Sequence, residues 1–415
     1  MESVVKKNVV FMVLSVFSVQ GAAYVAQLLM ARMLQTDQFA IVRTVEAALQ
    51  VLSAVAPMGI SLLVVRLAAQ IGDPGELRRR LTSYMVFAGV AGLVAASLCA
   101  LVLSLFATRQ ADHYLYLLVW VVVLSNLSRT ALNYFYGKEQ FALLSITTFV
   151  ISICYLAILT LFVSRWHLEG WVAAKYLGEL FFVVVTFFFI RPYLSANLLD
   201  TKSFRGLFTE GVAVSLSLVF RSAMDNFPLL VLAYLATSQI DVAMYGLCTL
   251  LAAAGMIIPA SINSVLLPKY SVLIKAAPAA LVWKHKRFAS VVVGAAGFVA
   301  ISLACAGVAL PWALGDNYTG IAPLLAITVL AIPLKALTTL NGNLLFVNSQ
   351  TRIGTQTNAC GALASIILSI LLFEYFGVWG VAVAALLVEA GVAVAFSRFA
   401  ASKLAHTIVQ SQHVE

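Results

Sequence analysis

Twelve apolar segments, each long enough to cross a lipid bilayer as an α-helix, constrain the fold of this chain more than any other feature. A helix needs about 20 predominantly apolar residues to cross the hydrocarbon core, where no water is present to satisfy backbone groups. The sequence therefore predicts an all-α integral membrane protein with twelve transmembrane helices. The segments lie near residues 8–32, 39–66, 81–107, 114–136, 141–164, 169–190, 206–235, 241–267, 288–312, 321–346, 354–375 and 380–400.

Composition and charge agree with this fold class. Of the 415 residues, 62% are hydrophobic and 10% are charged, which lies outside the range of soluble globular proteins. The net charge of +9 would indicate nucleic acid in a soluble protein, but most of the 26 Lys and Arg residues fall in loops on one side of the predicted membrane. The positive-inside rule then predicts a multi-pass protein with both termini in the cytoplasm and no nucleic-acid partner.

Cysteines and loops exclude several other classes of protein. The five cysteines lie within apolar segments and show neither a CxxC motif nor Cys/His spacing, so we expect five buried free thiols and no metal site. Segment 6–31 is too long for the apolar region of a signal peptide, and we interpret it as the first membrane helix. No loop is long enough to fold alone, so the function must reside in the membrane or at its surface.

The two halves of the sequence are weakly related. Segment 31–42 (ARMLQTDQFAIV) joins the first two helices as segment 233–245 (AYLATSQIDVAMY) joins the seventh and eighth, and Pro57 and Pro259 share the same offset. Parallel repeats of this kind recur in alternating-access transporters. We therefore predict two six-helix lobes around a central cleft. Their predicted limits are 1–195 for the first lobe, 196–205 for a cytoplasmic linker, 206–402 for the second lobe and 403–415 for a cytoplasmic tail.

Eight ionisable residues lie inside the predicted membrane helices. A charge at bilayer depth is costly, so such residues usually face a bundle interior or a water-filled cavity and mark a pathway. Because four of them are cations, an anionic cargo is the leading hypothesis. The eight are Arg43, Glu46, Lys175, Glu179, Arg221, Asp225, Lys335 and Glu389.

Spacing within the helices leaves two interpretations of these charges open. Three pairs, Arg43 with Glu46, Lys175 with Glu179 and Arg221 with Asp225, are three or four residues apart, so each could be an internally neutralised structural ion pair. Lys335 and Glu389 have no such neighbour. Either they pair across the bundle, or Lys335 meets an anionic substrate and Glu389 takes part in ion coupling.

Three segments resemble Wzx-type polysaccharide-unit flippases of the multidrug/oligosaccharidyl-lipid/polysaccharide (MOP) exporter superfamily, whose fold is also that of MATE transporters. The segment ARMLQTDQFAIV is similar to a conserved passage of that family, although Ala40 stands where glycine is usual. The other two segments are MGISLLVVRLAAQ at 58–70 and DNFPLLVLAYLATSQIDVAMYG at 225–246.

The resemblance implies a flippase that moves undecaprenyl-pyrophosphate-linked oligosaccharides from the cytoplasmic to the periplasmic leaflet of the bacterial inner membrane. It implies no cofactor and no catalytic residue, coupling to H⁺ or Na⁺, and contacts with membrane lipids and polysaccharide assembly proteins. On this hypothesis the cations Arg43, Lys175, Arg221 and Lys335 attract the pyrophosphate, and Glu46, Asp225 and Glu389 are candidates for ion coupling. The side chains expected to meet sugar hydroxyls are Gln20, Tyr24, Gln27, Gln50, Tyr245, Thr249, Thr339 and Asn343.

Two alternatives come from other classes. A MATE-type multidrug or cation antiporter would use carboxylates for cationic drugs, commonly one in the first helix, and the first predicted helix here has none. A membrane-embedded glycan polymerase or ligase would carry a large periplasmic loop or a carboxylate cluster, and no such feature or hydrolase motif occurs. The histidines are expected to be solvated at helix ends, in loops or in the tail: His113, His167, His285, His406 and His413.

Overall fold

The computed structural model describes residues 20–57, 59–71, 73–106, 109–195, 201–263, 266, 270, 278–347 and 350–412. For 61–62, 66, 69–70, 106, 201–214, 278–280, 346 and 403–412 it describes the backbone alone. Over these residues the chain is almost wholly helical and contains no strand. The predicted linker and tail lie partly outside the described residues.

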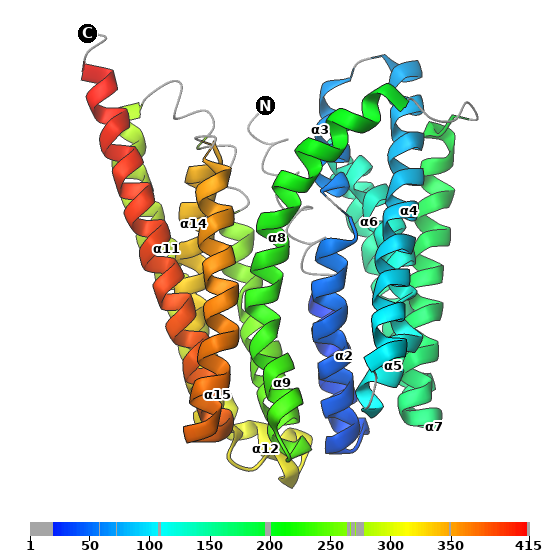
Figure 1. Ribbon diagram of the computed structural model, residues 1–415, viewed down its shortest axis with the longest axis vertical. Coiled ribbons are helices and arrows are strands. Elements are labelled where there is room, and N and C mark those ends of the chain that lie inside the picture. The colour runs from blue at the N-terminus through cyan, green and yellow to red at the C-terminus, as the bar shows by residue number, and fades with distance from the viewer. Residues whose placement is uncertain are drawn as a thin grey trace. The chain divides into compact units, whose positions relative to one another are not determined.

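The chain divides into two compact units, Met1–Ser222 and Ala223–Glu415, and the boundary falls inside a helix, α8. The first unit consists of long helices that lie side by side and connect through short turns (Figure 1). Its elements are a helix at residues 20–33, α2 (Thr36–Val55), α3 (Ile60–Gln70), α4 (Pro74–Phe106), α5 (Gln110–Leu118), α6 (Val121–Gly137), α7 (Phe141–Ile190), the 3₁₀ turn Arg191–Tyr193 and most of α8 (Thr201–Leu235).

The second unit has the same kind of construction. A short helix, α12, interrupts the connection between two of its long helices (Figure 1). The elements after α8 are α9 (Gln239–Gly255), a helix at residues 257–263, α11 (Pro278–Ala306), α12 (Leu310–Leu314), α13 (Ile321–Val329), α14 (Ala331–Val347) and α15 (Thr351–Gln412), with 3₁₀ turns at Gly307–Ala309 and Asp316–Tyr318.

The two longest helices each contain a sharp reversal. In α7 the backbone leaves helical geometry at His167 (φ 48°), and a Cβ atom on Gly170 would lie 2.1 Å from the carbonyl oxygen of Phe162. Eight residues of straight helix would separate these groups by about 12 Å, so the chain must fold back on itself. In α15 the same geometry occurs at Gly377 (φ 57°), where a Cβ atom on Gly380 would lie 2.0 Å from the carbonyl oxygen of Leu372. Each of these helices is therefore a tight hairpin of two membrane passes.

The apolar lengths account for the predicted number of passes. Among the described residues, eight helices are long and apolar enough to cross a membrane, or nine when α5 and α6 are taken as one span bent by 44°. With α7 and α15 as two passes each, and residues 20–33 as the described part of the first helix, the chain has twelve passes.

Helix breaks in both units fall beside the two prolines of the proposed repeat. The helix α2 ends at Val55, and α3 begins at Ile60 after Gly59, which adopts a positive φ of 75°. In the second unit α9 ends at Gly255, two residues before the helix that contains Pro259. Proline lacks a backbone N–H and displaces the preceding turn, so a break at each site is expected.

An aspartate fixes the start of α4. The Asp73 carboxylate accepts hydrogen bonds from the backbone N–H groups of Glu76 (3.0 Å) and Gly75 (3.2 Å), which would otherwise lack partners in the first helical turn. These bonds favour the charged form and hold the pKa of Asp73 below its usual value.

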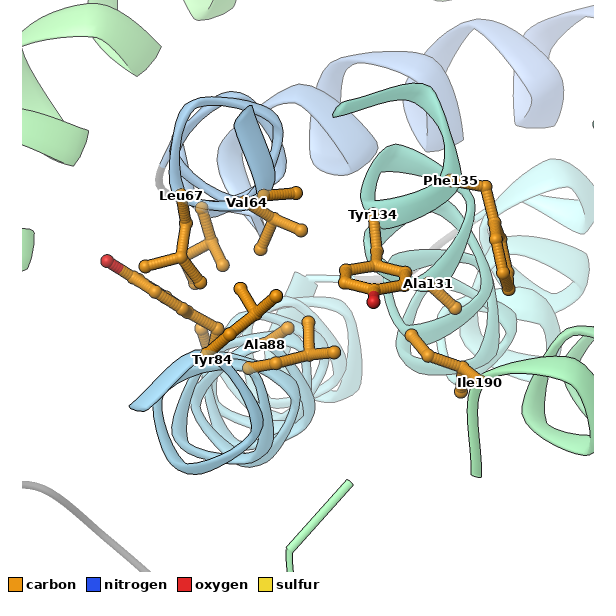
Figure 2. Packing of buried hydrophobic residues seen from close by; sticks show 13 residues of the cluster. Val64, Leu67, Tyr84, Ala88, Ala131, Tyr134, Phe135 and Ile190 are labelled. Atoms are coloured by element: carbon orange, nitrogen blue, oxygen red, sulfur yellow. The ribbon is translucent and has the colours of Figure 1, made fainter. Parts of the chain in front are cut away.

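The core of the first unit lies between α3, α4 and α6. Figure 2 shows Val64 and Leu67 of α3 facing α4, with the Tyr84 ring of α4 beside Leu67 and the Tyr134 ring of α6 on the other side of the cluster. The helices approach closely because Gly137 has no side chain: a Cβ there would lie 2.5 Å from the carbonyl oxygen of Val65. Lipid tails are as apolar as leucine, so small residues that permit tight van der Waals packing take over the role that water expulsion has in soluble proteins.

The two hairpin turns predict opposite responses to substitution. His167 adopts a backbone conformation that strains a residue with a side chain by about 1–3 kcal/mol, and Gly377 adopts the same conformation without strain. We expect His167→Gly to stabilise the protein by about 1 kcal/mol, and Gly377→Ala to destabilise it by about 1–3 kcal/mol. Thermal unfolding of the detergent-solubilised protein measures both. Equal shifts in the same direction would contradict the turn geometry.

Candidate functional site

An ion pair joins two helices in the interior of the first unit. The Nζ atom of Lys175, in the second half of α7, lies 2.7 Å from the Oε1 atom of Glu46 in α2. Most of the surface of both side chains is covered. In a bilayer such a pair is far less costly than either charge alone, because each residue supplies the opposite charge that the other needs.

An aromatic ring covers this pair. The Nζ atom of Lys175 lies 5.9 Å from the centroid of the Tyr155 ring, which comes from the first half of α7. The ring fits there because Gly178 has no side chain, and a Cβ at that position would lie 2.4 Å from Cδ2 of Tyr155. The hairpin turn of α7 thus brings an aromatic face against the cation. Tyr155 was not among the predicted site residues, because it lies on a different predicted helix from Lys175 and spacing along one helix does not show which side chains face it.

A second cation of the first unit is held by an amide. Arg43 is 5% exposed, and its Nη1 atom donates a hydrogen bond to Oε1 of Gln27 from the helix at residues 20–33. Tyr24 on the same helix and Glu46 on α2 are both close enough to interact electrostatically with the guanidinium. The structure therefore groups Arg43, Glu46 and Lys175 with Tyr24 and Gln27.

Glu179 completes this group of charges. It lies one turn after Lys175, within electrostatic range of Lys175, Arg129 and Glu46. Its Oε2 atom is buried and has no hydrogen-bond partner among the described residues. A carboxylate oxygen in this state is ready to accept a proton or a cation.

The second unit contains its own interhelical ion pair. The Nζ atom of Lys335 in α14 lies 2.6 Å from Oδ1 of Asp225 in α8. Both side chains are about one third exposed, so the pair is more accessible than its counterpart in the first unit. The buried Tyr245 of α9 is near enough to Asp225 to interact with it electrostatically.

Amide side chains connect the helices around this pair. Asn263 donates a hydrogen bond from Nδ2 to the carbonyl oxygen of Ala336, 3.1 Å away. Asn343 donates in turn to the carbonyl oxygen of Asn263 at 3.2 Å. These bonds fix α14 against the helix at residues 257–263 and so position Lys335.

Glu389 and Glu179 occupy equivalent positions in the two units. Each lies twelve residues after the residue that forms the hairpin turn, Gly377 in α15 and His167 in α7. Glu389 is buried, with 2% of its surface exposed. The equivalence is visible only once the two turns are known, and it places one buried carboxylate on the returning arm of each hairpin.

Other predicted side chains lie outside these groups. Gln20 and Gln50 are exposed, and Arg221 is half-buried in α8. The hydroxyls of Thr249 and Thr339 donate to carbonyl oxygens of their own helices, at 2.9 Å to Gly246 and 2.8 Å to Lys335. Both hydroxyls remain able to accept further hydrogen bonds.

Two ion pairs among the described residues join facing helices. Lys175 pairs with Glu46 at 2.7 Å, and Lys335 pairs with Asp225 at 2.6 Å across the bundle. Lys335 thus has a partner on another helix, which is one of the two possibilities that its spacing left open.

A buried histidine network in the second unit corrects the expectation that all histidines are solvated. His285 of α11 is 7% exposed, and its Nδ1 atom lies 2.9 Å from the Tyr270 hydroxyl. Its Nε2 atom lies 3.1 Å from Oδ1 of Asn341, which only accepts, so Nε2 carries the hydrogen and Tyr270 donates to Nδ1. Asn341 donates onward to Ser397 of α15 at 3.0 Å. The sequence predicted a loop at His285, because the charged residues Lys284, Lys286 and Arg287 lie beside it.

Neither metal ligation nor disulfide bonding is indicated. Over the described ranges, no group of three or more His, Cys, Asp or Glu residues is placed to hold a metal ion. All five cysteines are free, as predicted. Their expected burial was wrong for Cys305 and Cys360, which lie exposed on α11 and α15, because an apolar helix in a membrane has a lipid-facing side.

Comparison with known families gives one clear match. Residues 5–273 match the model of the polysaccharide biosynthesis protein family, which is more than half of the chain. Comparison with curated proteins gives no significant match.

Solved structures share the fold at low sequence identity. An inward-facing multidrug resistance MATE family transporter of the MOP superfamily superposes with a TM-score of 0.77 at 12% identity, covering 95% of this chain and 96% of that one. The lipid II flippase MurJ in an inward closed conformation superposes with a TM-score of 0.74 at 12% identity, covering 93% of this chain and 86% of that one. The Vibrio cholerae MATE transporter VcmN in its bent form gives 0.68 at 14%, covering 98% of both chains. The predicted all-α fold with twelve membrane helices in two lobes is confirmed.

A double-mutant cycle tests the assignment of partners in the first unit. Removing one member of a buried ion pair costs about 3–5 kcal/mol, so we expect Lys175→Met and Glu46→Gln each to lower the unfolding temperature strongly. The double variant should lose less stability than the two single variants lose together, with a coupling energy of about 0.5–3 kcal/mol. The matched cycle of Lys175→Met with Glu179→Gln should give a smaller coupling. A larger coupling to Glu179 would show that the intrahelical pair is the real one.

The histidine network predicts a second stability effect. His285→Phe leaves the Tyr270 hydroxyl without its acceptor and Asn341 without its donor, and we expect a loss of about 1–3 kcal/mol. His113→Phe on α5, where the side chain is exposed, is the matched control and should change stability by less than about 0.5 kcal/mol. Thermal unfolding of both variants checks this, and equal unfolding temperatures would exclude a structural role for the network.

Proposed function

The chain belongs to the polysaccharide biosynthesis protein family, and we propose that it is a flippase for polyprenyl-pyrophosphate-linked oligosaccharides. It carries them from the cytoplasmic to the periplasmic leaflet of the bacterial inner membrane, with both of its termini in the cytoplasm. The likeness of its fold to the lipid II flippase MurJ supports this proposal. Transport, not catalysis, is the role that family and fold indicate.

The cargo explains why buried cations are needed. A pyrophosphate and several sugars cannot cross hydrocarbon unaided, because desolvation of their charges and hydroxyl groups is prohibitive. A protein site must replace the lost hydration with charged and hydrogen-bonding groups, while the prenyl tail stays in lipid.

The observation that carries the proposal is the partly exposed pair of Lys335 and Asp225. The single carboxylate neutralises the lysine when no cargo is bound, at an Nζ to Oδ1 distance of 2.6 Å. A pyrophosphate brings more negative charge and more acceptor oxygens than one carboxylate, so it can replace Asp225 as the partner of Lys335. The pair thus gives the cation a partner in the membrane and leaves it accessible to an anionic headgroup.

The first unit offers a second site of the same kind. Lys175 is paired with Glu46, and Arg43 is held by the neutral amide of Gln27, which a phosphate could displace. In our proposal Arg43, Lys175, Arg221 and Lys335 all attract the headgroup. Eight polar side chains meet the sugar hydroxyls in this proposal: Gln20, Tyr24, Gln27, Gln50, Tyr245, Thr249, Thr339 and Asn343.

Ion coupling follows from the same chemistry. Binding of H⁺ or Na⁺ to Asp225 or Glu46 neutralises the carboxylate and releases its lysine for the cargo. Entry of the pyrophosphate and entry of the coupling ion then assist each other, which is the reciprocity that coupled transport requires. Glu389, buried on the returning arm of α15, is a third candidate for ion binding. The cargo site opens to one leaflet and then to the other as the helices rearrange.

The same fold also occurs in multidrug exporters, and the cation Lys335 separates the two functions. A carrier of cationic drugs gains nothing from a lysine at its binding site and should tolerate its loss. A carrier of pyrophosphates depends on that charge.

We expect Lys335→Ala to reduce flipping of a fluorescent polyprenyl-pyrophosphate-linked sugar in proteoliposomes by at least about tenfold, because one charged contact of about 1.5–3 kcal/mol is lost. A membrane-impermeant quencher measures the fraction of lipid in each leaflet. Lys335→Arg should retain more activity, since the charge is kept. Lys138→Ala, at the end of α6, is the matched control. Full activity of Lys335→Ala in a correctly folded protein would remove this assignment.

A second variant tests ion coupling. Asp225→Asn removes the carboxylate that a coupling ion would neutralise, so transport should no longer respond to an imposed proton or sodium gradient. The variant should still bind cargo, because Lys335 is then free of its competitor. A gradient response equal to that of the unaltered protein would show that Asp225 only stabilises Lys335.

A further inference from the structure

A groove of about 280 Å³ lies between α4, α6 and α7 of the first unit, away from the buried ion pairs. Its mouth is at the surface, because Val86 and Phe187 on its walls are 38% and 50% exposed. Side chains from all three helices form it, among them Thr82, Met85, Gly89, Leu127, Val183 and Phe187.

The groove presents an apolar surface, although two threonines line it. The Thr82 hydroxyl donates to the carbonyl oxygen of Arg78 at 2.9 Å and accepts the backbone N–H of Ser195 at 2.9 Å. The Thr186 hydroxyl donates to the carbonyl oxygen of Phe182 at 2.7 Å. Since both hydroxyls have partners, the groove offers van der Waals contact and suits a hydrocarbon chain.

Three arginines lie at one end of the groove. On α4 the lining residues follow each other at three- and four-residue steps, and one turn earlier the same helical face carries Arg78 and Arg79. On α7 the residue one turn after Phe187 is Arg191, whose guanidinium lies 4.7 Å from the Phe188 ring. All three arginines are exposed.

The nearby carboxylates are already engaged. Glu76 pairs with Arg80 at 2.6 Å, and Asp73 accepts the backbone N–H groups that begin α4. The three exposed arginines are therefore the charges that a ligand in the groove would meet. An apolar slot that ends in a basic rim is complementary to a molecule with a hydrocarbon chain and an anionic head.

We propose that this groove binds one acyl chain of an anionic membrane phospholipid, with the phosphate headgroup on Arg78, Arg79 and Arg191. The lining residues of α4 from Thr82 to Gly89 extend over about 10 Å, which is less than the half-thickness of about 15 Å of the hydrocarbon core. The groove therefore stays within one leaflet, as a phospholipid chain does. A polyprenyl chain is the other candidate occupant, and the experiment below distinguishes the two.

Native mass spectrometry of the purified full chain, titrated with phosphatidylglycerol or with phosphatidylcholine of the same acyl chains, measures the binding. Phosphatidylglycerol should bind more tightly, since only its headgroup has a net negative charge. Replacing the three arginines (R78Q, R79Q and R191Q together) should weaken the binding of phosphatidylglycerol roughly a hundredfold. The matched control replaces Lys284, Lys286 and Arg287 of α11 by glutamine and should change binding little.

Filling the groove tests the chain-binding half of the proposal. A Cβ on Gly89 would meet Leu127 Cδ2 at an ordinary 3.5 Å, so Gly89→Leu is compatible with the helix backbone while its side chain occupies the groove. It should abolish the preferred phosphatidylglycerol adduct. Gly297→Leu on α11, where an added Cβ meets nothing within 4 Å, is the control and should bind lipid normally.

Three results would overturn the proposal. The first is equal binding of the two phospholipids, and the second is unchanged binding in both the arginine and the Gly89 variants. The third is tenfold tighter binding of a polyprenyl phosphate than of phosphatidylglycerol, together with loss of that binding in Gly89→Leu. This result would assign the groove to a polyprenyl chain. Gel filtration and the unfolding temperature without added lipid confirm that each variant is folded.

Discussion

The absence of water from the hydrocarbon core is the constraint on which the rest of this structure depends. Every charge placed there needs a partner from the protein, and facing helices supply it. Lys175 and Glu46 join α7 to α2, and Lys335 and Asp225 join α14 to α8. A pair that satisfies two charges in lipid also holds the lysine near the substrate path that we propose. Stability and cargo binding thus rest on the same few contacts.

The two units repeat one construction and then use it differently. Each has a helix break beside a proline and a hairpin whose turn residue has positive φ, with a glutamate twelve residues later. The lysines do not follow the repeat: Lys175 lies on the returning arm of a hairpin, whereas Lys335 lies on α14. The shared features are those that determine backbone geometry, and the divergent ones are those that we assign to cargo. A cargo with a charged head and a neutral glycan has no twofold symmetry, so equivalent sites in both units would be of no advantage.

Side-chain size decides where helices meet and where they leave room for lipid. Gly137 and Gly178 allow backbone or ring contacts that any Cβ would prevent. Between α4, α6 and α7 the opposite holds: Gly89 removes volume that no neighbouring side chain fills, and a groove results. In a soluble protein such a gap would expose apolar surface to water at a cost. In a membrane it is filled by a hydrocarbon chain, and the basic rim makes it selective for anionic lipid.

By itself the sequence determined the helical class, the number of membrane passes and which charges lie inside apolar segments, because apolar length and residue type are properties of local segments. Only the tertiary structure decided that Lys335 pairs with Asp225, 110 residues away, and that His285 is buried in a hydrogen-bond network. It alone revealed the equivalence of Glu179 and Glu389. Partners of this kind depend on how helices rotate and pack against each other, and residue spacing along one helix carries no information about the facing helix.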